Sequence, residues 1–282
     1  MTFDPDIESY YAQGGEQARL DQGYFPLERA RTQEIVLRHL PPPPAVVLDV
    51  GGAAGAYALW LAARGYEVHL IDPVALHVEQ AARASAASGQ ALASVSVGDA
   101  RALVREDASA DAVLLLGPLY HLIERADRLR ALREARRVLR RNGFLFAAAI
   151  SRFASLVDNL AHLGSISLPP VLADQVVERM VRQDLAGGLH LNPTSEAQYF
   201  TTAYFHHPDA LAGEIRAAGL ALVDLLPVEG LGTLTAGFGQ AWADGARRET
   251  LLSLVREVER EPTLLGVSPH LIAVARRNGD EK

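Results

Sequence analysis

The stretch Val46-Val47-Leu48-Asp49-Val50-Gly51-Gly52-Ala53-Ala54-Gly55-Ala56-Tyr57 decides the fold of this 282-residue chain. A short apolar run rich in valine ends in an acid and a cluster of small residues, and a helical pattern follows from Leu59 to Ala63. This order predicts a strand, a tight turn and a helix, the first unit of a nucleotide-binding type of α/β fold. Small residues in the turn let a ligand approach the backbone, and the first amides of the helix remain available to donate to it.

The composition of this turn indicates which ligand it takes. A dinucleotide-binding turn has the pattern G-x-G-x-x-G, in which the glycines admit a pyrophosphate. Here these positions hold Gly51, Ala53 and Ala56, so two of the three glycines are absent. Asp49 is the only charged residue between positions 45 and 63. The turn therefore favours a neutral or cationic ligand over an anion.

Strand patterns alternate with helical patterns along most of the chain. Strands are expected near residues 45–50, 67–71, 92–97, 112–116, 144–150, 220–226 and 270–275. The alternation predicts an α/β fold with a doubly wound, seven-stranded, mostly parallel sheet, whose ligands bind at the carboxyl ends of the strands. Asp49, Asp72 and Asp99 all fall at strand ends, as does the turn at residues 117–121, so we expect them to share one site.

These motifs together resemble the class I S-adenosylmethionine-dependent methyltransferases. The resemblance covers roughly residues 45 to 150 and lies in residues 48–55, Ile71-Asp72-Pro73, Gly98-Asp99-Ala100-Arg101, residues 111–116 and residues 142–146. It implies a Rossmann-like methyltransferase fold with S-adenosylmethionine as the cofactor. It also implies that the last strand runs antiparallel, between strands five and six. Where the family has a middle glycine in the turn, this sequence has Ala53.

The resemblance assigns roles to the residues at the strand ends. It implies that Asp72 accepts hydrogen bonds from the ribose hydroxyls, that Asp99 with Ala100 faces the adenine amine, and that Asp49 adds negative potential near the sulfur. For Asp72 the alternative is a helix N-cap, and for Asp99 a cap of the turn. The expected cofactor-binding residues are Asp49, Gly51, Gly52, Ala53, Gly55, Asp72, Pro73, Asp99, Ala100, Leu116 and, from the N-terminal leader, Tyr11 and Arg31. For both leader residues, packing of a surface helix is the alternative.

We expect a single methyltransferase domain over residues 1–282. Its parts are an N-terminal helical cap (1–44), a cofactor-binding core (45–150), a lid insertion (151–205) and the remainder of the core (206–278). The cap contains a helix from about Leu27 to Leu40, which four prolines end. The insertion contains helices near 152–163 and 170–184, and the remainder of the core contains helices at 208–218 and about 246–261. Aromatic residues gather near the end of the insertion. An insertion at this place is expected to close over a substrate.

Methyl transfer is a displacement in which the placement of the two reactants matters more than any single catalytic residue. An acceptor that is a hydroxyl or a protonated amine needs a base, and histidine titrates near the working pH. His121 and His206 are therefore the candidate catalytic residues, with buried packing as the alternative for both. Tyr120, Tyr199 and Tyr204 are candidate substrate-binding residues, and packing in the core is again the alternative.

Composition excludes several other kinds of chemistry. The chain has no cysteine, and its only lysine is Lys282, so thiol nucleophiles, thiolate zinc sites and Schiff-base or P-loop lysines are ruled out. We also expect no metal site, because Gly117-Pro118 stand where metal-dependent relatives have an acidic pair. The net charge of −7 disfavours nucleic acid as a partner. Eight arginines fall between Glu124 and Arg141, but apolar residues recur there at helical spacing, which predicts a solvated amphipathic helix.

We interpret the chain as an enzyme that transfers a methyl group from S-adenosylmethionine to an oxygen, nitrogen or carbon of a small molecule. No window approaches the roughly 20 apolar residues of a membrane span, so we expect a cytoplasmic protein without a membrane partner, as a monomer or homodimer. One alternative is a nicotinamide-dependent oxidoreductase, which Ala53 and Ala56 oppose. A second alternative is a non-catalytic protein that keeps the fold and binds the cofactor.

Overall fold

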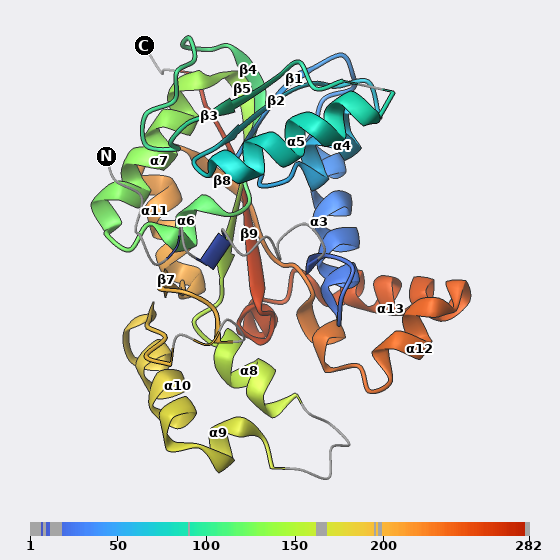
Figure 1. Cartoon of the computed structure of the whole chain (residues 1–282), viewed down its shortest axis with the longest axis vertical. Coiled ribbons are helices and arrows are strands. Elements are labelled where there is room, and N and C mark those ends of the chain that lie inside the picture. Colours follow the sequence, from blue (N-terminus) through green and yellow to red (C-terminus); the bar gives the residue numbers. More distant parts are fainter. Residues whose placement is uncertain are drawn as a thin grey trace.

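A seven-stranded sheet forms the centre of the protein (Figure 1). The computed structural model describes residues 7, 10–11, 19–89, 91–161, 168–194, 196 and 199–279. The strands are β1 (Val46–Val50), β2 (Glu67–Asp72), β3 (Ser94–Val97), β4 (Ala110–Leu115), β5 (Leu139–Ile150), β8 (Ala221–Pro227) and β9 (His270–Arg276). Their order is β3-β2-β1-β4-β5-β9-β8, with β1 to β5 parallel and β9 antiparallel to both of its neighbours. The predicted strand count and the implied insertion of the last strand are both confirmed.

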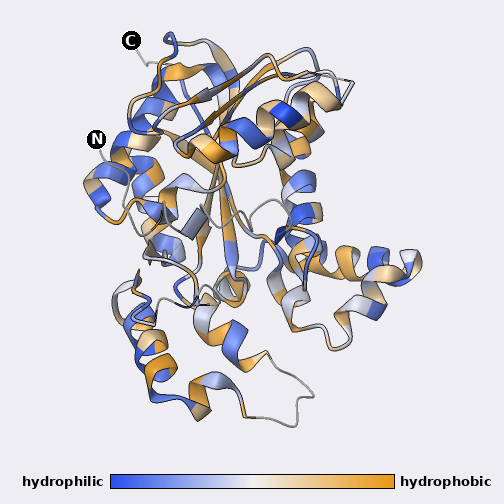
Figure 2. Cartoon of the chain, in the orientation of Figure 1, coloured by the Kyte–Doolittle hydropathy of each residue, from blue (hydrophilic) through white to orange (hydrophobic). Residues whose placement is uncertain are grey.

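Helices cover both faces of this sheet. The covering helices are α3 (Phe25–His39), α4 (Ala56–Ala62), α5 (Ala75–Ala87), α7 (Arg125–Val138) and α11 (Pro208–Ala217). The short helix α6 (Pro118–His121) follows β4, whereas α12 (Phe238–Ala243) and α13 (Gly245–Val258) extend away from the sheet (Figure 1). There are also 3₁₀ turns at Gly230–Leu234 and Pro262–Val267. One apolar core joins the sheet to α7 and α11, and a second joins its other face to α3, α4 and α5. The strands between these layers are largely apolar, whereas polar residues lie on the outer helix surfaces (Figure 2).

The arginine-rich segment forms α7, and its buried face is the one predicted. Leu129, Leu132 and Ala135 are buried, and the last two belong to the apolar core on this face of the sheet. Arg128 differs from the predicted solvated face, because it is 2% exposed and its guanidinium donates to both carboxylate oxygens of Glu214 on α11. This ion pair joins the two helices that cover the same side of the sheet.

The insertion after β5 is more divided than the sequence predicts. It contains α8 (Ala154–Leu160), α9 (Pro170–Ala173), α10 (Gln175–Gly187) and a small sheet of β6 (Leu189–His190) and β7 (Ala203–Tyr204). The expected helix over 170–184 is broken at Asp174, whose side chain accepts a hydrogen bond from the amide of Val176 at 2.7 Å and caps α10. The expected helix over 152–163 reaches only Leu160, and its last two predicted residues lie in 162–167, outside the described residues.

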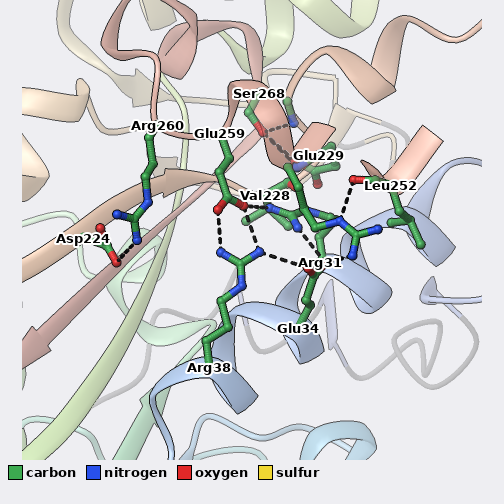
Figure 3. Close-up of polar contacts among 12 residues, drawn as sticks. Arg31, Glu34, Arg38, Asp224, Val228, Glu229, Leu252, Glu259, Arg260 and Ser268 are labelled. Atoms are coloured by element: carbon green, nitrogen blue, oxygen red, sulfur yellow. Dashed lines mark hydrogen bonds and ion pairs between the residues drawn. The ribbon is translucent and has the colours of Figure 1, made fainter. Parts of the chain in front are cut away.

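A polar network ties the leader helix α3 to the C-terminal part of the chain (Figure 3). Arg31 is fully buried and donates to Glu34 at 2.6 Å, to Glu259, and to the carbonyl oxygen of Val228 at 3.3 Å. Arg38 also donates to Glu34 and Glu259. Because its guanidinium is held here, the expected contact of Arg31 with the cofactor is wrong. None of the helices within the described residues is long and apolar enough to cross a membrane.

Candidate functional site

A cavity of about 290 Å³ lies at the carboxyl ends of β1 to β4. It brings together Asp49, Asp72 and Asp99, the three acids predicted to converge. The other predicted residues that line it are Tyr11, Gly51, Gly52, Ala53, Pro73, Ala100, Leu116, Tyr120 and His121. The strand ends therefore form one shared site, as the alternation of the sequence predicts.

The turn after β1 is tightly packed. A Cβ atom on Gly51 would lie 2.6 Å from Pro118 Cγ, and one on Gly52 would lie 2.7 Å from an oxygen of Asp49. Only glycine fits at these two positions, so the backbone forms the floor of the cavity. Gly55 differs from its expected role, because it caps the start of α4 with a φ of +89° and does not line the cavity. Ala53 has a left-handed φ of +48°, which an L-residue adopts at a cost.

Asp72 both holds this turn and lines the cavity. One carboxylate oxygen accepts from the amide of Ala53 at 2.9 Å, and the other accepts from the amide of Val74 at 2.9 Å and from His77 Nδ1 at 3.1 Å. His77 also lines the cavity, and its Nε2 atom is buried without a hydrogen-bond partner among the described residues. No motif pointed to His77, although its place in the first turn of the helix after Asp72 is a signal for such a contact.

Asp49 is almost fully buried, with 1% of its surface exposed. Burial, and next the charge of Asp72, raise the pKa of Asp49 to about 7. One of its carboxylate oxygens finds no hydrogen-bond partner within the described part of the chain. A ligand that carries a positive charge would stabilise the ionised form of this group and offset its desolvation.

Asp99 is held in one orientation by Arg101. The guanidinium of Arg101 donates to both carboxylate oxygens, at 2.6 to 3.0 Å, and its amide donates to one of them at 2.8 Å. Burial alone would raise the pKa of Asp99, but these hydrogen bonds outweigh burial and lower it. Arg101 is fixed in turn by Asp127 at 2.8 Å. Asp99 is therefore an ionised acceptor at the edge of the cavity.

A second cavity of about 300 Å³ adjoins the first and shares Tyr11, Arg19 and Tyr120 with it. Residues of β5, α8 and α10 and of the segment before β7 line it, and the predicted substrate-binding residue Tyr199 is among them. Tyr204 is not, because its ring packs 3.7 Å from the guanidinium of Arg128. The expected substrate contact of Tyr204 is therefore wrong.

The two candidate bases lie in different surroundings. His206 is fully buried, is hydrogen-bonded to Glu214 at 3.3 Å and lines neither cavity, so its expected catalytic role is wrong. His121 does line the first cavity, and its Nε2 is hydrogen-bonded to the hydroxyl of Tyr11 at 2.7 Å. Burial lowers the pKa of His121 to about 3. A base of this strength removes protons poorly near neutral pH, which favours a positioning role.

The first cavity fits an adenosyl sulfonium cofactor. It offers three carboxylates to hydroxyl, amino and sulfonium groups, together with a turn in which glycine allows a close approach. Buried polar atoms of Asp49 and His77 find no partner among the described residues, as expected where a ligand supplies one. The guanidinium of Arg101, which also lines this cavity, is already paired with Asp99 and Asp127. The fold and this site define an α/β enzyme of the methyltransferase type.

The comparisons with known proteins agree with this class. Residues 47–143 match the family described as methyltransferase domain. Among solved structures, a methyltransferase from Methanosarcina mazei is 17% identical, with 86% of this chain and 97% of that chain covered and a TM-score of 0.57. A methyltransferase from Mesorhizobium loti is also 17% identical, with 92% of this chain and 100% of that chain covered and a TM-score of 0.55. The [4+2]-cyclase SpnF is 19% identical, with 89% of this chain and 81% of that chain covered and a TM-score of 0.54.

At these identities the solved structures show the fold alone, and the sequence match supplies the family. Residues 47–143 form a methyltransferase domain of the class I S-adenosylmethionine-dependent type, with S-adenosylmethionine as the cofactor of this domain. The sequence resemblance and the predicted cofactor are thereby confirmed.

Proposed function

We propose that this enzyme transfers a methyl group from S-adenosylmethionine, bound in the first cavity, to a small molecule bound in the second cavity. The observation that carries this proposal is that the two cavities adjoin and share Tyr11, Arg19 and Tyr120. Adjoining cavities can bring two reactants together at short range, and alignment at short range is the main requirement of a displacement. A volume of about 300 Å³ suits a small organic molecule.

The roles of the cofactor-binding residues are part of this proposal. Asp72 accepts hydrogen bonds from the ribose hydroxyls while it also accepts one from the amide of Ala53. Asp99 and Ala100 face the adenine amine. Asp49 supplies negative charge to the cavity. When bound, S-adenosylmethionine supplies an electrophilic methyl group on a sulfonium.

Tyr11 and His121 position the reactants in this proposal. The Tyr11 ring packs edge-on against both His77 and His121, with ring centroids 5.3 and 5.2 Å apart. The leader thus contributes a side chain to the lining that the two cavities share. No proton transfer through His121 is required.

The test is a search for the acceptor. The purified protein is incubated with cofactor that carries an isotope-labelled methyl group and with a whole extract of the native cell, and the labelled products are found by mass spectrometry. We expect a labelled product that does not form with the Asp72→Ala variant. A labelled product that is a protein or a nucleic acid, with no labelled small molecule, would contradict the proposal.

Asp72→Ala also tests the cofactor site directly. The variant loses acceptors for two hydroxyl groups and the bond to the Ala53 amide, so we expect binding of S-adenosylhomocysteine to weaken by about 2 kcal/mol or more. Calorimetry measures this change, and Glu79→Gln, an exposed substitution on α5, is the control. An unchanged dissociation constant for Asp72→Ala would show that Asp72 does not bind the cofactor.

We expect the protein to be a monomer or a homodimer, and light scattering of the same sample measures its oligomeric state.

A further inference from the structure

Most of the charged side chains that line the second cavity already have partners. Arg19 donates to Glu28 at 2.7 Å, and His190 is hydrogen-bonded to Asp184 at 3.0 Å. The carboxylate of Asp158 accepts a hydrogen bond from a tyrosine hydroxyl at 2.9 Å. These groups compensate one another, so the net charge of the wall does not select an occupant. The group that recognises an occupant is therefore a polar atom that the protein leaves without a partner.

His270 offers such an atom. It is the first residue of β9, and its side chain lines the second cavity and is 17% exposed. Its Nδ1 lies 2.6 Å from a carboxylate oxygen of Glu229, which only accepts, so Nδ1 carries a hydrogen. Its Nε2 has no hydrogen-bond partner within the described part of the chain. Nε2 is therefore the ring nitrogen that is left for an occupant of the cavity.

Glu229 holds the ring of His270 in this orientation. Glu229 is fully buried, and its second carboxylate oxygen accepts from the hydroxyl of Ser268 at 2.8 Å and from the backbone amide of His270 at 3.1 Å. The hydroxyl oxygen of Ser268 accepts in turn from the amides of Glu229 and Gly230, at 3.1 and 3.0 Å. A histidine whose Nδ1 is fixed by a carboxylate presents its Nε2 in one orientation and one role.

Near neutral pH this Nε2 atom also carries a hydrogen. Burial lowers the pKa of His270, but the charges of Glu229 and Glu28 outweigh burial and the opposing charge of Arg19 and raise it to about 9. Glu28 lies 3.9 Å from Nδ1 and is bonded to Arg19, which lines both cavities. His270 therefore offers an N–H donor to the second cavity near the lining that it shares with the first. Such a donor binds an oxygen lone pair and repels a protonated amine.

We propose that His270 is a catalytic residue that binds the acceptor oxygen through Nε2, and that the acceptor is a hydroxyl compound with the acidity of a phenol. This inference rests on the proposed function and narrows the methylated atom to oxygen. Glu229 is a positioning residue, because it acts through His270. The acidity follows from proton matching: a phenol such as the tyrosine side chain has a pKa of about 10, close to the raised pKa of His270.

The aromatic lining of the second cavity also suits a phenol. Eight of its lining residues are Phe or Tyr, although aromatic residues make up only 6% of the chain. Tyr10 and Tyr120 both contact the ring of Phe200, with centroids 5.4 and 6.2 Å apart. A planar aromatic ligand gains stacked and edge-on contacts with such rings in addition to the burial of its apolar area.

The transfer step needs no group beyond these. Because Nε2 already carries a proton near neutral pH, the acceptor binds as its anion and its own hydroxyl proton leaves to solvent. The oxygen lone pair forms the new O–C bond, and the S–C bond breaks with its electron pair left on sulfur. The N–H of His270 stays hydrogen-bonded to the oxygen and keeps its proton throughout, so it stabilises the anion and fixes the direction of attack.

The test uses three ligands built on one nitrobenzene ring: para-nitrophenol, its methyl ether para-nitroanisole, and para-nitrobenzyl alcohol. Of the three, the phenol alone loses a proton near neutral pH, and its anion has a distinct absorption spectrum. Calorimetry measures the binding of each ligand to the whole protein saturated with S-adenosylhomocysteine, so that no transfer interferes.

We expect para-nitrophenol to bind at least about tenfold more tightly than the ether or the benzyl alcohol. At a pH one unit below the pKa of the free phenol, where about a tenth of it is ionised, we expect about half or more of the bound phenol to absorb as the anion. Equal binding of the three ligands, tighter binding of the ether or the benzyl alcohol, an unchanged spectrum, or no binding of the phenol up to about 10 mM would overturn the inference.

Two variants locate the effect. His270→Asn keeps an amide donor near the position of Nδ1 and removes Nε2, so we expect the preference for phenol over ether to fall to about twofold or less, with ether binding unchanged and the anion spectrum lost. His207→Asn is the same substitution at an exposed histidine that lines neither cavity, and we expect it to change nothing. A preference that survives in folded His270→Asn protein would remove His270 from the site. If this variant does not fold, the ratios and the spectrum of the wild-type protein decide.

The outcome separates this inference from the proposed function. Selective binding of the phenol as its anion, with no labelled methyl transferred to any small molecule, would remove the proposed function and leave the phenol site. Labelled products that carry the methyl group only on nitrogen, carbon or a carboxylate oxygen would keep the proposed function and remove the inference about His270.

Discussion

Replacing Ala53 with glycine tests the strain in the turn that forms the floor of the first cavity. The φ of Ala53 is +48°, and an L-residue in the left-handed region costs about 1–2 kcal/mol. Glycine avoids this cost but loses about 0.5–1 kcal/mol more conformational entropy on folding than alanine does. The two terms together predict that Ala53→Gly stabilises the protein by about 0.5–1 kcal/mol.

Ala54→Gly is the matched control, because Ala54 lies next in the same turn and is not among the residues with positive φ. It incurs only the entropy cost, so we expect it to destabilise the protein by about 0.5–1 kcal/mol. The two variants should therefore differ by about 1–2 kcal/mol in the free energy of unfolding.

Urea unfolding of the three proteins, followed by circular dichroism, measures both changes. The hydrogen bond from the residue 53 amide to Asp72 is available to either residue at that position, so binding of S-adenosylhomocysteine should be unchanged or slightly tighter in Ala53→Gly. If Ala53→Gly destabilises the protein as much as Ala54→Gly does, the turn is not strained at residue 53 and the reasoning is refuted.

Three further predictions concern charged groups. Because the pKa of Asp49 is about 7, the affinity for cationic S-adenosylmethionine relative to neutral S-adenosylhomocysteine should rise several-fold between about pH 6 and pH 8, and calorimetry that gives a constant ratio would contradict this. Arg31→Met leaves Glu259 buried with one partner fewer, so we expect urea unfolding to show a free energy of unfolding lower by about 3 kcal/mol. A changed dissociation constant for S-adenosylhomocysteine would instead indicate that Arg31 does contact the cofactor. The pKa of His270 is raised to about 9, so its contribution to stability is fully present below its ordinary pKa of about 6.5 and is lost as the pH rises through about 9. The difference in unfolding free energy between wild type and His270→Gln should therefore shrink by up to about 3 kcal/mol over this range, and a difference independent of pH would count against the ion pair.

The strands and the acids at their ends were predictable because both depend on local sequence. Buried parallel strands appear as short apolar runs, and the residue that follows each run lies at the ligand-binding edge of the sheet. Asp49, Asp72 and Asp99 needed no knowledge of distant residues to be placed there. Ala53 was also recognisable as the departure from the family pattern, although its left-handed conformation was not.

The errors concern side chains whose partners are far away in the sequence. Arg31 was assigned to the cofactor because nothing local shows that Glu259 lies beside it. His206 was assigned to catalysis, but Glu214 on the next helix holds its ring in the interior. Tyr204 lay in an aromatic run, and the sequence could not show that Arg128 packs against it. Such pairs depend on tertiary packing, which periodicity does not encode.

The second cavity could not be predicted for the same reason. Its charged residues come from the leader, from α8 and α10, and from the start of β9, which are separated by long stretches of chain. The two-residue strands β6 and β7, which flank part of its wall, are too short to produce an alternating pattern. The sequence analysis named Tyr120 and Tyr199, and both line this cavity, whereas closure of the insertion over a substrate stays a prediction.

The position of β9 in the sheet has a consequence for the synthesis of the protein. β9 is the last strand of the sheet to be translated, yet within the described part of the chain it is the one strand that pairs with β8, and it covers one edge of β5. While the nascent chain grows, β8 has no neighbour to join and the β5 edge stays open, until residues 270–276 leave the ribosome. The first five strands can assemble during translation, but the sheet closes only after residues 270–276 have been made.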